Sequence, residues 1–177
     1  MNENLYSLFE SRFPADRGRP LLLLEDGRAL TYGEAEARCA QYAGLLAGLG
    51  LAPGERVAVQ VEKSPEALLL YLACLRAGLV YLPLNSAYQE GEVGYFLENA
   101  APGAVVAQPR SMPWLAPLAA RLGIRHLFTL DERGEGSLVD AARGGSVRFT
   151  TVERAGGDLA AILYPSGTTG RSKGAMI

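Results

Sequence analysis

Short apolar runs alternate with helical patterns along almost the whole chain, and this alternation constrains the fold more than any other feature. Each run has the length of a buried strand, and turn residues separate it from the next helical segment. We expect strands at 21–24, 57–61, 80–82, 104–107, 125–130 and 159–164, and helices at 31–49, 65–76, 90–99, 114–122 and 138–142. The alternation predicts an α/β fold, with a largely parallel β-sheet and helices on both faces.

Two of the expected helices begin with specific capping signals. Thr31 is followed three residues later by Glu34, which is typical of a capping box. Ser64 before Pro65 fits an N-cap with proline at the first helical position. The helix at 65–76 is apolar almost all round, so we expect it to be sandwiched between other layers. Residues 131–157 have a weaker pattern and are expected to form a surface connection.

Composition excludes several classes of function. A chain of 177 residues that is 49% hydrophobic can bury the core of one domain, or most of one lobe of a larger domain. The net charge is −2 and no cluster of Lys and Arg is interleaved with aromatic residues, so nucleic-acid binding has no support. No apolar run approaches the roughly 20 residues of a membrane span, and the N-terminus does not resemble a signal peptide.

The cysteines and the single histidine lie in apolar patterns. Cys39 and Cys74 fall inside helical segments without neighbours at metal-ligand spacing, so we expect reduced, buried thiols in a cytoplasmic protein and no metal site. His126 lies in a strand pattern, which favours a core or edge histidine over a general base.

Near its end the chain reads Leu163-Tyr164-Pro165-Ser166-Gly167-Thr168-Thr169-Gly170-Arg171-Ser172-Lys173-Gly174. Glycines allow successive backbone N–H groups to point inward, hydroxyl groups add donors, and the lysine supplies a positive charge. The segment is therefore predicted to bind phosphate groups. The alternative is a glycine-rich hairpin that binds no ligand.

Two common phosphate-binding motifs do not fit this segment. The P-loop of NTPases has two glycines five positions apart, followed at once by Lys and then Ser or Thr. If Gly167 were the first glycine, the second would have to be at position 172, which is Ser172. Lys173 is followed by Gly174 and not by Ser or Thr. The dinucleotide fingerprint is also missing, because no Gly-x-Gly precedes a helix here.

The segment closely resembles the signature loop of the adenylate-forming superfamily, which includes acyl-CoA synthetases, luciferases and nonribosomal peptide adenylation domains. Residues 30–34 resemble the first core motif of that superfamily, and residues 75–85 resemble the second, in the same order and at similar spacing. Arg171-Ser172-Lys173, together with residues 81–88, is most similar to malonyl-CoA synthetases.

This resemblance implies two half-reactions. A carboxylic acid and MgATP give an acyl-adenylate and pyrophosphate, and coenzyme A then displaces AMP to form a thioester. By position in the motif, the resemblance assigns catalytic roles to Thr168 and Lys173. It assigns nucleotide binding to Ser166, Gly167, Thr168, Thr169, Gly170 and Lys173. The implied cofactors and partners are ATP, Mg²⁺, coenzyme A and a small carboxylic acid, with malonate favoured.

Pro165 departs from the superfamily pattern, which usually has threonine at this position. Proline removes one hydroxyl and one backbone N–H and fixes φ. If the usual threonine contacts phosphate, its loss raises the barrier by about 3 kcal/mol, by analogy with the loss of one oxyanion-hole donor. We therefore expect Pro165 to weaken ATP binding or turnover.

Gly174-Ala175-Met176-Ile177 resembles the start of an apolar strand, so we interpret residues 1–177 as the N-terminal part of an AMP-binding domain. The superfamily's later motifs and C-terminal domain are not included, so this chain alone is expected to be inactive. Its exposed sheet edges favour self-association. Two alternatives remain open at this stage: an adenylation domain that loads a carrier protein, and a non-catalytic interaction protein that retains the fold.

Overall fold

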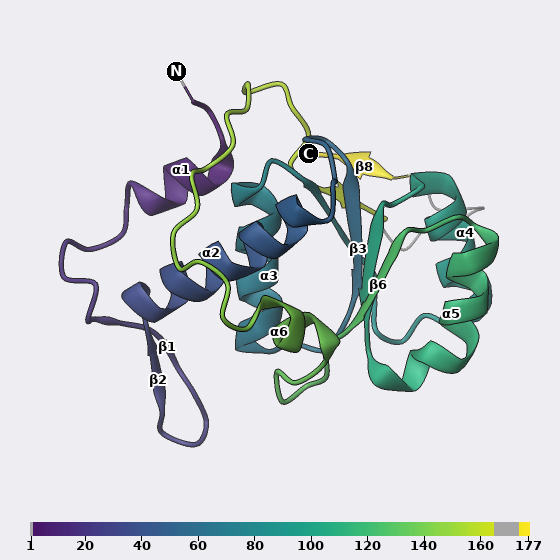
Figure 1. Ribbon diagram of the computed structural model, residues 1–177, viewed down its shortest axis with the longest axis horizontal. Helices are drawn as coiled ribbons and strands as arrows, with labels where there is room; N and C mark the ends of the chain where they lie inside the picture. Colours follow the sequence, from purple (N-terminus) through teal and green to yellow (C-terminus); the bar gives the residue numbers. More distant parts are fainter. Residues whose placement is uncertain (1, 165–173) are drawn as a thin grey trace.

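The computed structural model describes residues 2–164 and 174–177, and a four-stranded parallel sheet lies at its centre (Figure 1). The strand order is β4-β3-β5-β6, so β4 and β5 lie on opposite sides of β3. The strands are β3 (Arg56–Gln60), β4 (Val80–Pro83), β5 (Ala104–Ala107) and β6 (His126–Thr129). The connection from β4 to β5 therefore crosses β3, as parallel strands require a crossover.

Helices cover both faces of this sheet (Figure 1). One layer contains α1 (Leu5–Glu10), α2 (Tyr32–Gly48), α3 (Pro65–Arg76) and α6 (Ser137–Ala142), and the other contains α4 (Glu90–Ala100) and α5 (Met112–Arg121). Side chains alternate along β3: Val57 and Val59 face the first layer, and Ala58 faces the second. The predicted α/β fold with helices on both faces is confirmed.

Two short hairpins accompany the sheet. β1 (Pro20–Leu23) pairs antiparallel with β2 (Ala29–Thr31), and β7 (Ile162–Leu163) pairs antiparallel with β8 (Ala175–Met176). The strand predicted at 159–164 is therefore shorter than expected, because only Ile162 and Leu163 pair with β8. The helix predicted at 114–122 begins two residues earlier, since Pro113 is tolerated in its first turn. The strand predicted at 174–177 is present as β8.

The predicted caps form as the sequence indicates. Thr31 Oγ1 accepts a hydrogen bond from Glu34 N at 3.2 Å, and Glu34 Oε2 accepts one from Thr31 N at 2.9 Å. Ser64 Oγ accepts from Ala67 N at 3.2 Å. α3 is buried along most of its length between α2 and the sheet, which confirms the prediction of a sandwiched helix.

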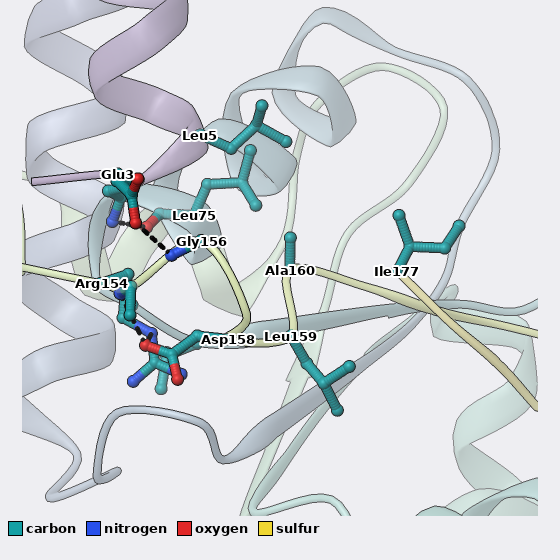
Figure 2. Close-up of a pocket in the computed structure, with 13 residues that line it drawn as sticks. Glu3, Leu5, Leu75, Arg154, Gly156, Asp158, Leu159, Ala160 and Ile177 are labelled. Atoms are coloured by element: carbon teal, nitrogen blue, oxygen red, sulfur yellow. Dashed lines mark hydrogen bonds and ion pairs between the residues drawn. The ribbon is translucent and has the colours of Figure 1, made fainter.

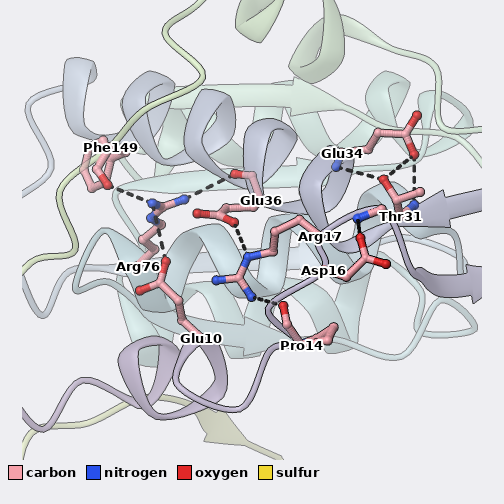
Figure 3. Close-up of polar contacts among 10 residues, drawn as sticks. Glu10, Pro14, Asp16, Arg17, Thr31, Glu34, Glu36, Arg76 and Phe149 are labelled. Atoms are coloured by element: carbon pink, nitrogen blue, oxygen red, sulfur yellow. Dashed lines mark hydrogen bonds and ion pairs between the residues drawn. The ribbon is translucent and has the colours of Figure 1, made fainter.

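Arg76, the last residue of α3, joins three distant segments (Figure 3). Its guanidinium donates to Glu36 O at 3.2 Å and to Phe149 O at 2.9 Å, and it lies 3.9 Å from the Glu10 carboxylate. It also lies 4.8 Å from the ring centroid of Tyr6. Arg76 is 6% exposed, so its charge is stabilised almost entirely by protein groups.

Gly78 connects α3 to β4 and is required for two reasons. Its φ is +71°, a left-handed conformation that favours glycine. A Cβ at this position would also lie 2.9 Å from Val152 Cγ1. The connection at 131–157, predicted to lie on the surface, thus packs closely against the second sequence motif at this point.

Cys39 and Cys74 are both buried and unpaired, and burial raises the pKa of the Cys39 thiol to about 11. His126 lies on the outer strand of the four-stranded sheet, where Nε2 is 3.0 Å from Leu49 O, so of the two predicted positions, core or edge, it occupies the edge. Among the residues that the structure describes, no helix has the length and apolar character to cross a membrane.

Candidate functional site

The glycine-rich segment begins at the carboxyl edge of the parallel sheet. Tyr81 N donates to Ala160 O at 3.0 Å, and a parallel bridge joins Tyr81 to Ala161. β7 therefore runs in the same direction as β4, and its carboxyl end lies at the edge where β3 and β4 also end. Ligands of open α/β sheets bind at this edge.

The residues predicted to bind nucleotide lie outside the described part of the chain: Ser166, Gly167, Thr168, Thr169, Gly170 and Lys173. Pro165 lies outside it as well. The structure gives the two points from which their segment extends, Tyr164 and Gly174. Leu163 pairs with Ala175, so Tyr164 directly follows one strand of an antiparallel pair and Gly174 directly precedes the other.

Tyr164 is held against α4 at both its ring and its hydroxyl group. The ring centroid lies 4.4 Å from that of Phe96, and the hydroxyl donates to Asn99 Oδ1 at 2.6 Å. Burial, and then the neighbouring Tyr95, raise the pKa of the Tyr164 phenol. The phenol therefore stays protonated at neutral pH and remains a hydrogen-bond donor.

Gly174 lies where a side chain would collide with β7. A Cβ on Gly174 would be 2.8 Å from Ile162 Cγ2 and 3.4 Å from the Tyr164 ring. A larger residue would therefore displace one strand of the β7–β8 hairpin. Together, Tyr164 and Gly174 fix the two ends of the predicted phosphate-binding segment.

Polar side chains gather at the same edge between β3 and β5. The helices that follow these two strands, α3 and α5, lie on opposite faces of the sheet, so this is its topological switch point. Arg110 Nη2 lies 3.2 Å from Glu62 Oε1. The side chain of Gln108, and then that of Ser86, hold the pKa of the Glu62 carboxyl below its usual range. Glu62 is therefore ionised at neutral pH and would repel a nearby phosphate.

Gln60, the last residue of β3, orders the chain after β4. Its Nε2 donates to Asn85 O at 3.1 Å and to Tyr88 O at 2.9 Å, and the residue is only 3% exposed. The Tyr88 ring in turn lies 5.2 Å from that of Phe96. Gln60 thus connects the end of β3 to the aromatic group that supports Tyr164.

These supporting residues were not predicted, although the sequence carries a signal for some of them. Glu62 follows the strand at 57–61, and Gln108 follows the strand at 104–107. Polar residues after the carboxyl ends of parallel strands meet at one edge, so both could have been assigned to the site. Asn99 has no comparable signal, because it is one polar residue at the exposed end of a helix.

A second candidate is a cavity of about 200 Å³ between the N-terminal segment and residues 154–160 (Figure 2). Its two carboxylates each have a partner within the cavity lining. Glu3 Oε2 accepts from Gly156 N at 2.6 Å, and Asp158 Oδ2 lies 3.2 Å from Arg154 Nε. These contacts connect the N-terminal segment to residues 154–158 and leave few donors for a phosphate.

Across residues 2–164 and 174–177, no group of three His, Cys, Asp or Glu side chains is arranged to hold a metal ion.

Comparison with known proteins identifies the family. The family model described as AMP-binding enzyme matches residues 9–177. The chain belongs to the AMP-binding enzyme family. AMP-binding enzymes are adenylate-forming, so the resemblance noted in the three sequence motifs is confirmed.

The solved structure of ATP-bound MatB from Rhodopseudomonas palustris superimposes on the whole chain. The TM-score is 0.94 at 47% identity, and the match covers 100% of this chain and 35% of MatB. Tyrocidine synthase 3 of Brevibacillus parabrevis is 32% identical over 100% of the chain, which covers 3% of that protein. AMB antimetabolite synthetase AmbB of Pseudomonas aeruginosa is 33% identical over 98% of the chain, which covers 13% of it. The chain thus spans about a third of MatB and a small part of either synthetase.

Proposed function

We propose that this chain is the N-terminal part of an ATP-dependent, AMP-forming acyl-CoA synthetase, with malonate as the favoured acid. The observation that carries this proposal is the 47% identity to ATP-bound MatB, a malonyl-CoA synthetase, over the entire chain. The similarity of Arg171-Ser172-Lys173 to malonyl-CoA synthetases also supports it.

The donors of the glycine-rich segment suit the phosphate groups of ATP. Phosphate oxygens are only acceptors, and this segment offers backbone N–H groups, the hydroxyls of Ser166, Thr168 and Thr169, and the Lys173 ammonium. In adenylation, negative charge builds on the departing pyrophosphate. Donors that are already oriented around it favour the transition state. We assign this role to the segment, with Thr168 and Lys173 as its catalytic residues.

The domain boundary is part of the same proposal. We propose that residues 1–177 end just after the phosphate-binding segment, and that the acyl pocket and the C-terminal domain belong to the longer protein. Without those parts, the acid and the nucleotide are not positioned for reaction. Purified residues 1–177 should therefore show no ATP–pyrophosphate exchange with any acid, and measurable exchange would refute this boundary.

The assay that tests the activity combines the full-length protein with MgATP, coenzyme A and a panel of acids. Mass spectrometry should detect malonyl-CoA, with malonate converted faster than acetate, propionate or amino acids. Exchange of pyrophosphate with malonate, but no thioester in the presence of coenzyme A, would contradict the CoA-ligase assignment.

The second candidate is an adenylation domain that loads a carrier protein, and the identity to tyrocidine synthase 3 supports it. The two candidates differ in the thiol that accepts the acyl group. A phosphopantetheinylated carrier protein that is acylated faster than free coenzyme A would favour this second function. An intact protein that binds no MgATP would instead favour a non-catalytic interaction protein.

A further inference from the structure

We propose that Asn99 and Phe96 position the start of the glycine-rich segment through Tyr164, and that this placement governs how tightly ATP phosphates are held. The inference rests on the proposed function, because it concerns the same site. Asn99 and Phe96 are positioning residues, since both act through Tyr164.

Asn99 and Phe96 lie three residues apart on α4, so they occupy one face of that helix. Tyr164 contacts both of them, through the 2.6 Å hydrogen bond to Asn99 Oδ1 and the 4.4 Å ring contact with Phe96. The two planes of the ring pair are inclined by 35°. A side chain that is held at its ring and at its hydroxyl has little freedom to rotate or to slide along the helix.

Helix α4, which contacts Tyr164, is firmly packed in the fold. Phe96 is 5% exposed and belongs to the core cluster between the sheet and helices α4 and α5. Its ring also contacts Tyr88 at 5.2 Å and Tyr95 at 5.5 Å. A capping box between Gln89 and Glu92 fixes the first turn of α4. Tyr164 is therefore attached to a packed helix rather than to a loop.

The position of Tyr164 matters because it immediately precedes Pro165. Donors that stabilise a developing charge must lie about 2.7–3.1 Å from the oxygens they serve. A displacement of about 1 Å can reduce a rate by about a hundredfold. The Asn99–Tyr164 hydrogen bond fixes the residue after which the glycine-rich segment begins. Its loss should therefore lower the affinity for ATP and leave the affinity for the acid unchanged.

The test uses ATP–pyrophosphate exchange by the full-length protein at saturating acid. Tyr164→Phe and Asn99→Leu should each raise the KM for MgATP about three- to tenfold, the usual effect of one lost hydrogen bond. The KM for the acid and the Tm should not change. Asn99→Asp keeps an acceptor oxygen and should retain a KM for MgATP within about twofold of wild type.

A double variant separates a shared hydrogen bond from two independent effects. Because Tyr164→Phe and Asn99→Leu remove the same bond, the combined variant should be no worse than either single variant. Tyr71→Phe is the matched control: it also removes one tyrosine hydroxyl, but from α3 on the opposite face of the sheet, and it should leave both KM values unchanged.

Three results would overturn the inference: an unchanged KM for MgATP in both single variants, an equal rise in KM for ATP and acid, or fully additive effects in the double variant. If wild type shows no exchange with any acid, the proposed function fails. In that case, calorimetry with MgATP tests the inference separately. The inference is rejected if Tyr164→Phe binds MgATP with the affinity of wild type, or if wild type does not bind MgATP.

Discussion

The polar contacts around Arg76 differ in kind from those at the carboxyl edge of the sheet. Arg76 is 6% exposed and bonds to backbone carbonyls from segments far apart in the sequence. At the carboxyl edge, the side chains of Glu62 and Arg110 are 42% and 69% exposed, and their ion pair faces solvent. A buried charge that bonds to backbone carbonyls of distant segments fixes the fold, whereas an exposed pair contributes little to stability and leaves its edge accessible to ligands. The comparison separates residues whose substitution should lower stability from residues whose substitution should weaken the binding or turnover of ATP.

The largest effect on stability is expected at Arg76. Arg76→Met leaves the carbonyls of Glu36 and Phe149 without their donor, so the free energy of unfolding should fall by about 3 kcal/mol. Thermal unfolding of the full-length protein measures this loss. Arg17→Met is the control, because the Arg17–Glu36 pair is partly exposed and its loss should cost about 1 kcal/mol or less. Equal losses in the two variants would contradict the distinction.

The largest effect on activity is expected at Lys173. The chain has two lysines, Lys63 and Lys173, and only Lys173 lies in the glycine-rich segment. Lys173→Ala should lower the rate of ATP–pyrophosphate exchange by about 10²–10³-fold, the usual effect of removing one transition-state donor, with an unchanged Tm. Lys63→Ala removes the other lysine and should change the rate less than about twofold. Similar rates in both variants would remove Lys173 from the site.

Pro165→Thr should raise the adenylation rate, whereas Lys173→Ala lowers it. Threonine restores a hydroxyl and a backbone N–H, so the adenylation rate of the full-length protein should rise, by at most about a hundredfold. Pro165→Ala restores the N–H alone and separates the two contributions. An unchanged rate in Pro165→Thr would show that Pro165 does not impair the segment.

The smallest effect is expected at the capping box that begins α2. Hydrogen bonds from the backbone and then the side chain of Thr31 lower the pKa of Glu34. A lowered pKa stabilises the folded state above the unfolded pKa of about 4.3, and this contribution is lost as the pH falls through the folded pKa.

Thr31→Ala should cost about 1 kcal/mol at pH 7 and less at pH 3. Glu34→Gln retains a capping side chain but should remove this part of the pH dependence. Thermal unfolding at both pH values measures the difference. A Thr31→Ala loss that is the same at pH 7 and pH 3 would contradict the role of Glu34.

The elements predicted well are those that the local sequence determines. The helix at 65–76 has the predicted bounds because Ser64, Pro65 and Gly78 define its two ends locally. The strand at 104–107 also has the predicted bounds. In both cases a run of apolar side chains is bounded by turn residues, so no distant contact is needed to place its ends.

The elements that were missed depend on distant contacts. α1 has six residues, and its N-cap Asn4 donates to Leu75 O and Val152 O, both at 2.8 Å. A helix this short is not stable alone, so its own sequence gives little sign of it. The Tyr164–Asn99 contact joins residues 65 positions apart, and periodicity cannot predict such a pair. The motif predicts where the site lies along the chain, whereas the contacts around Tyr164 depend on the fold.

Hydrogen–deuterium exchange of the full-length protein with and without MgATP tests the central distinction most directly. The account predicts that MgATP protects peptides that cover 160–176 and the adjacent carboxyl edge at 60–63 and 85–88, while peptides around Arg76 and the cavity of Figure 2 do not change. Protection centred on residues 3–5 and 154–158, with none at 160–176, would contradict it.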